Sequence, residues 1–69
     1  MSNDILKCRH TLKGHIIARK HDVRAVIDDL SYILPGLAGS RSEERVSAAI
    51  KLLEGAFDEL LLAERLFTK

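Results

Sequence analysis

The sequence holds little of what builds a disulfide-bonded, β-rich or membrane-spanning protein. Cys8 is the single cysteine, which excludes an intrachain disulfide and a cysteine-rich metal site. One proline, no tryptophan and three aromatic residues argue against a β-rich fold. The longest unbroken apolar run, Leu60 to Ala63, is far shorter than the roughly 20 residues that span a bilayer. These absences favour a helical protein without a membrane span.

Length and charge exclude further classes. A chain of 69 residues is one small domain and is too short to enclose a deep pocket, so we expect no enzyme activity and no cofactor. Eleven basic and ten acidic residues give a net charge of +1, too balanced for a bulk nucleic-acid binder. The three histidines lack the spacing of a zinc set, so no metal is expected. Residues 1–4 have no signal-peptide pattern and the single cysteine suits a reducing compartment, so we expect a cytoplasmic protein.

One break divides the chain, from Pro35 to Ser40. Proline removes a backbone donor and disfavours helical geometry at the residue before it, and two glycines follow within this stretch. We therefore expect a single helical hairpin domain over residues 1–69. Its parts are a helix over about 4–34, a loop over 35–41 and a helix over about 43–67.

Apolar residues before the break recur in steps that are sums of threes and fours, as on an amphipathic helix. They are Ile5, Leu12, Ile16, Val23, Ile27, Leu30 and Leu34. Ser2, Asn3 or Asp4 can cap the start of this helix. Cys8 falls near the stripe and is expected to be buried and inert.

The second helix has its own start signal and stripe. Ser40 to Glu43 reads as a capping box, in which the serine hydroxyl and the glutamate carboxylate each accept a backbone N–H. The stripe that follows is Val46, Ile50, Leu53, Phe57, Leu60 and Phe67, widened by Leu52, Leu61, Leu62 and Leu66. The two helices thus predict an all-α, antiparallel two-helix hairpin.

A lone hairpin leaves much of this apolar surface wet, and chains below roughly 70–80 residues rarely gain enough stability from one core. We expect a homodimer that forms a four-helix bundle, with Leu53, Phe57, Leu60 and Phe67 in the dimer core. The surplus apolar surface could instead receive a different protein. The expected binding residues at the ends of the hairpin are Tyr32, Leu62 and Leu66.

The polar face of the first helix carries the remaining candidates. Residues 1–24 hold six basic and two acidic side chains, net +4, whereas residues 25–69 hold five basic and eight acidic, net −3. The pattern suits either an ordinary solvated face or a positive patch for an acidic partner surface. The expected partner-binding residues on this helix are His10, Lys13, Ile17, Lys20, His21 and Arg24.

Within this face, His10-Thr11-Leu12-Lys13-Gly14 resembles the phosphorylation motif of histidine phosphotransfer domains, which relay phosphate between kinases and response regulators. The resemblance implies that His10 accepts the phosphoryl group, Lys13 offsets its charge and Gly14 gives clearance. His21-Asp22-Val23-Arg24 is similar to the phosphorylated segment of sensor-kinase dimerisation domains.

Three functions follow, in this order. The first is a non-enzymatic regulator that binds a signalling protein or transcription regulator and inhibits it. The second is phosphotransfer through His10, ranked lower because only nine residues precede His10 and bulky residues follow Gly14. The third is a nucleic-acid-binding dimer that uses Lys13, Arg19, Lys20 and Arg24.

Overall fold

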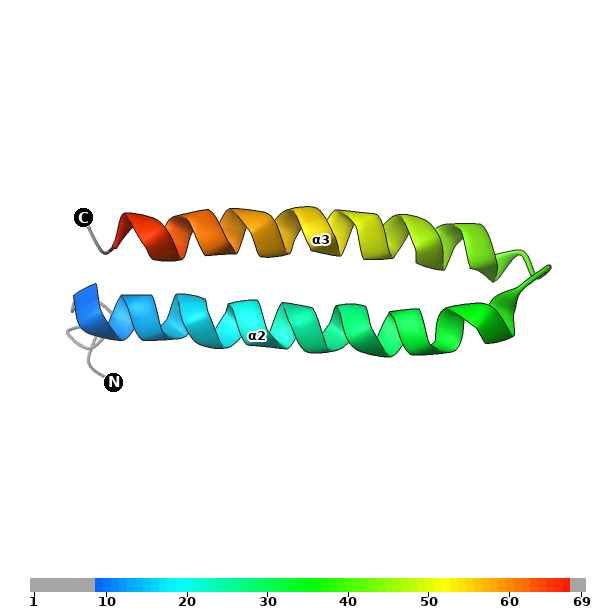
Figure 1. Ribbon diagram of the computed structural model, residues 1–69, viewed down its shortest axis with the longest axis horizontal. Coiled ribbons are helices and arrows are strands. Elements are labelled where there is room, and N and C mark those ends of the chain that lie inside the picture. Colours follow the sequence, from blue (N-terminus) through cyan, green and yellow to red (C-terminus); the bar gives the residue numbers. More distant parts are fainter. Residues whose placement is uncertain (1–8, 68–69) are drawn as a thin grey trace, which may run out of the picture.

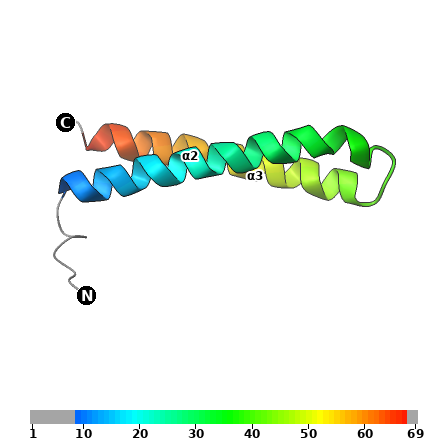
Figure 2. The same cartoon turned by 90° about the horizontal axis from the view of Figure 1, so that it is seen from below.

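Two long antiparallel helices make up the described part of the chain. The structure is a computed structural model that describes the backbone of residues 9–67 and the side chains of residues 11–67. Helix α2 spans Arg9–Ile33, the short 3-10 helix η1 spans Leu34–Leu37, and helix α3 spans Ser42–Leu66. The helices lie side by side, with the connection at one end of the molecule, and cross at a shallow angle (Figures 1 and 2). The expected all-helical hairpin is confirmed, and no strand occurs within residues 9–67.

Several expectations lie outside the described residues. They concern the helix start near residue 4, the caps at Ser2, Asn3 or Asp4, the apolar Ile5, the burial of Cys8 and the side chain of His10.

The connection between the two helices lies at the proline and glycine residues, as the sequence predicts. Helix α2 ends at Ile33, because the ring of Pro35 disfavours helical geometry at Leu34. The chain continues as η1 and then turns at Gly39, whose φ of 83° lies in the left-handed region that glycine tolerates best. The Ser40 N–H donates to the Leu37 carbonyl at 2.9 Å, which closes the turn.

The expected capping box at Ser40 and Glu43 is wrong. The Ser40 hydroxyl donates to the Leu37 carbonyl at 2.7 Å, and it forms no cap bond with an N–H at the start of α3. Helix α3 begins at Ser42, and its cap residue Arg41 makes no side-chain cap bond. The Glu43 carboxylate reaches back, but it accepts the N–H of Gly39 at 3.1 Å, one residue earlier than a capping box requires.

The interface between the helices is built from two stripes with alternating steps of three and four residues, which we call the inner stripes. On α2 the inner stripe is Ile16, Lys20, Val23, Ile27, Leu30 and Leu34; on α3 it is Val46, Ile50, Leu53, Phe57, Leu60, Glu64 and Phe67. All of these side chains are at least partly buried, but only Ile27, at 3% exposure, is classed as buried among the described residues. A hairpin of two helices therefore has a narrow core centred on Ile27.

Candidate protein interaction surfaces

Lys20, expected at a partner interface, lies between the two helices. Its ammonium is 2.5 Å from Oε1 of Glu64, and the two side chains are 13% and 25% exposed. The hydrogen bond from Lys20 lowers the pKa of the Glu64 carboxyl below its usual value, against the opposing effect of burial. The charges of Lys20, Lys13 and His21 lower this pKa further. The ion pair joins the first half of α2 to the last turns of α3.

Lys13 and Arg24, expected on the polar face of the first helix, both approach α3. Lys13 is half-buried and lies near enough to Glu64 to affect its pKa, because it stands two helical turns before Lys20 on the same side of α2. The Arg24 guanidinium lies 5.6 Å from the centre of the Phe57 ring, so it also reaches α3.

Acidic side chains compensate much of the positive charge of α2. Nε of Arg19 lies 2.9 Å from Oδ2 of Asp22, and Nε of Arg24 lies 3.6 Å from Oδ1 of Asp28. Both pairs are well exposed, so each contributes at most about 1 kcal/mol to folding. Their main consequence is electrostatic. Because Lys20 is paired as well, the positive potential of the basic face is lower than the net charge of residues 1–24 suggests.

The outer face of α2 points away from α3. Its residues alternate in steps of three and four and are Thr11, Gly14, Ala18, His21, Ala25, Asp28 and Tyr32. Small side chains leave a shallow hollow there, lined by Thr11, Gly14, His15, Ala18 and Arg19. A Cβ atom at Gly14 would meet no atom within 4 Å, so the glycine faces open space. At the other end of this face Tyr32 is 85% exposed.

The remaining expected contact residues divide between two places. Ile17 is half-buried beside the inner stripe, and the backbone of His10 lies in the first turn of α2. Leu62 and Leu66 are both exposed on the far side of α3. The structure therefore does not gather the predicted binding residues into one site.

One side of the hairpin is apolar along both helices, which the sequence analysis did not identify. We define this apolar side by residues that immediately precede an inner-stripe residue: Val26, Ile33, Ala49, Leu52, Ala56, Ala63 and Leu66. Because the helices are antiparallel, one step back along either chain rotates to the same side of the two-helix layer. Leu52 is 76% exposed and Leu66 is 68% exposed, while Val26 and Ile33 are nearly half exposed. In the sequence, this side corresponds to a second series of apolar residues. Each member stands one position before an inner-stripe residue, so the series follows the same heptad spacing.

The expected dimer-core residues contribute to the hairpin itself. Phe57 contacts Arg24, and Leu53 and Leu60 share its inner stripe. Each of these side chains stays partly exposed. A second layer of helices would complete their burial.

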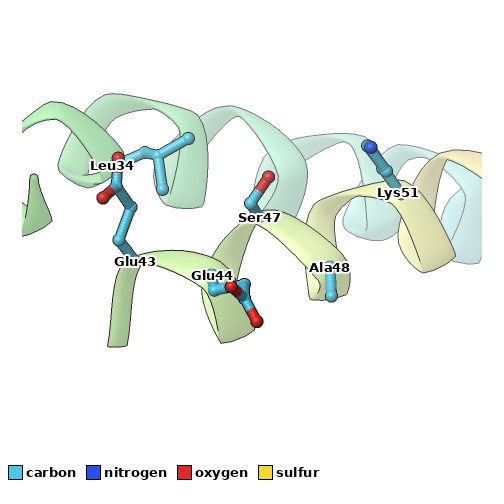
Figure 3. Close-up of a pocket in the computed structure, with 6 residues that line it drawn as sticks. All are labelled: Leu34, Glu43, Glu44, Ser47, Ala48 and Lys51. Atoms are coloured by element: carbon cyan, nitrogen blue, oxygen red, sulfur yellow. The ribbon is translucent and has the colours of Figure 1, made fainter. Parts of the chain in front are cut away.

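A second shallow hollow lies near the connection (Figure 3). It is lined by Leu34, Glu43, Glu44, Ser47, Ala48 and Lys51. Over the described residues no group of three or more His, Cys, Asp or Glu side chains is arranged to hold a metal ion. No helix in that part of the chain is long and apolar enough to cross a membrane.

The comparisons with known proteins give no assignment. The chain matches no family model, no curated protein and no solved structure.

Proposed function

We propose that this protein is a small, non-enzymatic helical regulator that forms a homodimer, binds another protein and inhibits it. The observation that carries the proposal is the apolar side of the hairpin, where Leu52 and Leu66 expose more than two thirds of their surface. Contiguous exposed apolar surface of this kind marks protein–protein contacts.

The small core of the hairpin supports the proposed dimer. Among the residues whose side chains are described, Ile27 alone is buried, which is a small core for two helices of 25 residues each. Two hairpins that pack through their apolar sides would form a four-helix bundle. Such a bundle would complete the burial of Leu53 and Leu60 and cover Leu52.

The outer face of α2 is the surface we propose for the regulated protein. It points away from α3 and would remain on the outside of the bundle. Tyr32 offers a large amphipathic side chain of the kind that dominates binding energy at interfaces, and the hollow at Gly14 and Ala18 can admit a side chain of the partner. His21 lies between these two features on the same face.

The binding function is tested by capture and titration. The tagged dimer is used to isolate partners from cells that express it, and each purified candidate is titrated by calorimetry and assayed for loss of its activity. Tyr32→Ala and Ala18→Glu should weaken binding at least tenfold while the dimer persists. Glu54→Gln, on an exposed position of α3, is the matched control. A partner that binds both variants as tightly as wild type would contradict the placement of the surface, and a dimer without any inhibitory partner would contradict the function.

Phosphotransfer through His10 is the alternative, and one observation supports it. Gly14 faces open space one helical turn after His10, which leaves the clearance that the resemblance requires. Lys13 does not share that face, since it is half-buried near Glu64. Incubation with a phosphorylated response regulator tests the alternative. An acid-labile label lost in His10→Ala and retained in His21→Ala would establish it, and we expect no label.

A further inference from the structure

We infer that the two copies of the proposed homodimer are related by a two-fold axis parallel to the helices, so that α2 of each copy lies over α3 of the other. This inference rests on the proposed homodimer and specifies its geometry. It is carried by the shape of the apolar side, where large side chains of α2 stand level with alanines of α3. The connection closes one end of each hairpin (Figure 1), so both connections would lie at the same end of the dimer.

Two contacts across the interface show which residues of the two helices are level. Lys20 meets Glu64, and four residues further along α2 the Arg24 guanidinium lies over the Phe57 ring. Because the helices are antiparallel, counting from the first contact sets Arg24 level with residue 60. Its observed partner is three residues away, so the two contacts agree to within one helical turn.

Each large residue of α2 on the apolar side has an alanine of α3 beside it. Both contacts set Val26 level with Ala56, and Ile33 level with Ala49, to within two residues or about 3 Å. Val26 and Ile33 are 47% and 43% exposed and form a ridge along α2. The alanine row of α3, which is Ala49, Ala56 and Ala63, offers only Cβ atoms at the same levels.

The ridge and the alanine row decide between two possible axes. A two-fold axis that joins the same side of two layers lies in the plane between them. If the axis runs parallel to the helices, every residue keeps its level, and Val26 and Ile33 pack against the partner's Ala56 and the partner's Ala49. If the axis runs across the helices, α2 lies over α2 and α3 over α3, so ridge meets ridge. The parallel axis is the one that places large side chains against small ones, as close packing requires.

The parallel axis also covers an exposed leucine of α3. Leu52 is 76% exposed and stands three residues after Ala49, at the outer edge of the apolar side. The partner's Ile33, seated over Ala49, borders Leu52 as well. At the open end the same geometry brings the partner's Arg19 over Ala63. The exposed guanidinium of Arg19, which is paired with an aspartate, can stay at the rim while its aliphatic stem covers the alanine.

The extent of the apolar side suits a dimer interface. From Ala49 to Leu66 it runs about 25 Å, and two helices side by side are about 20 Å wide. This gives about 500 Å² per copy and roughly 1,000 Å² in total, which is near the lower limit for a specific interface. The other side of the layer carries the exposed charges of Lys51, Glu54 and Asp58, whose burial would be costly, so pairing uses the apolar side.

A size-swap cycle tests the arrangement. Dimer dissociation constants are measured by sedimentation equilibrium for wild type, Val26→Ala, Ala56→Val and the double variant. Each single change leaves a gap or a clash at two places of the symmetric dimer and should weaken dimerisation about tenfold. The double variant exchanges the large and the small side chain and should return to within about threefold of wild type. The matched control combines Ala56→Val with Ile33→Ala, which lie at different levels, and should stay at least as weak as Ala56→Val.

The position of the connections gives an independent measurement. A nitroxide label is attached at the exposed position 38 through Ala38→Cys in a Cys8→Ser background, and the distance between the two labels of the dimer is measured by pulsed electron paramagnetic resonance. Because packed helices lie about 10 Å apart, a parallel axis should give a label distance below about 25 Å. An axis across the helices would separate the labels by the length of a helix, about 37 Å for 25 residues.

The outcomes separate this inference from the proposed function. Labels separated by a helix length, or a double variant no tighter than the single ones, would overturn the parallel axis while the homodimer stands. A chain that stays monomeric at high concentration would overturn both. Circular dichroism on each variant checks that the helices persist.

Discussion

Lys20 and Glu64 are 44 residues apart in the chain and meet at 2.5 Å across the helix interface. The pair occupies one position of each inner stripe, where apolar residues stand at most other positions. It lies at the open end of the hairpin, away from the connection, where no covalent link holds the helices together. Both partners are long enough to keep contact with water, so the charges are neither fully buried nor fully screened.

The first prediction concerns acid stability. The ordinary pKa of a glutamate side chain is about 4.5, and the pKa of Glu64 in the folded chain is lower because Lys20 donates a hydrogen bond to it. A depressed folded pKa adds stability that is present above the unfolded pKa and lost as the pH falls through the folded pKa. We expect the unfolding free energy of wild type to decline below about pH 4.5 more steeply than that of Glu64→Gln. Urea titrations from pH 7 to pH 3 measure this, and equal slopes would contradict it.

The second prediction compares two glycines. Gly14 lies inside α2 with open space around its missing Cβ, so Gly14→Ala should stabilise the protein by about 0.5–1 kcal/mol. Gly39 has equally open surroundings but a φ of 83°, so Gly39→Ala should destabilise it by about 1 kcal/mol. Urea denaturation at one fixed protein concentration gives both values. Effects of the same sign at the two positions would refute the conformational argument.

The third prediction concerns the core. Ile27 is 3% exposed, and Ile27→Ala should cost about 2–4 kcal/mol because it removes apolar contact and leaves a cavity. Val26→Ala, at the neighbouring half-exposed position, should cost less in the monomer. Denaturation curves at several protein concentrations separate the loss of folding from the loss of association. A smaller effect at Ile27 than at Val26 would show that the core is centred elsewhere.

The fourth prediction separates the two faces of α3. Leu52→Asp places a charge on the apolar side and should shift the proposed dimer to monomer at micromolar concentration, with helicity recovered as protein concentration rises. Leu53→Asp, one residue further, places the charge against α2 and should unfold the hairpin itself. Light scattering and circular dichroism distinguish these results. Identical behaviour of the two variants would mean that the same apolar stripe of α3 both packs against α2 and forms the dimer contact.

Much of the fold could be predicted from the sequence. The break at Pro35 needs only the chemistry of proline, and the two helices need only the periodic recurrence of apolar residues, so both features are local. The inner stripe of α2 contains five residues of the predicted apolar stripe, from Ile16 to Leu34. The start of the second helix was harder to predict. The Ser40 hydroxyl could either accept an N–H of the following helix or donate to a preceding carbonyl, and in the structure it donates to the carbonyl of Leu37.

The candidate surfaces were only partly predictable, because periodicity gives the angle of a residue about its helix axis and not which neighbour covers that angle. The spacing of α3 fits two apolar stripes, one through Leu53 and one through Leu52, and only the position of α2 decides which is inner. The same holds for Lys20, which counts as a surface cation in the sequence and becomes the partner of Glu64 once the helices pack. The sequence by itself determined the helices and their separation at Pro35, through backbone chemistry and local periodicity. The tertiary structure alone decided which charges are paired and which apolar side remains uncovered, because both depend on residues brought together from opposite ends of the chain.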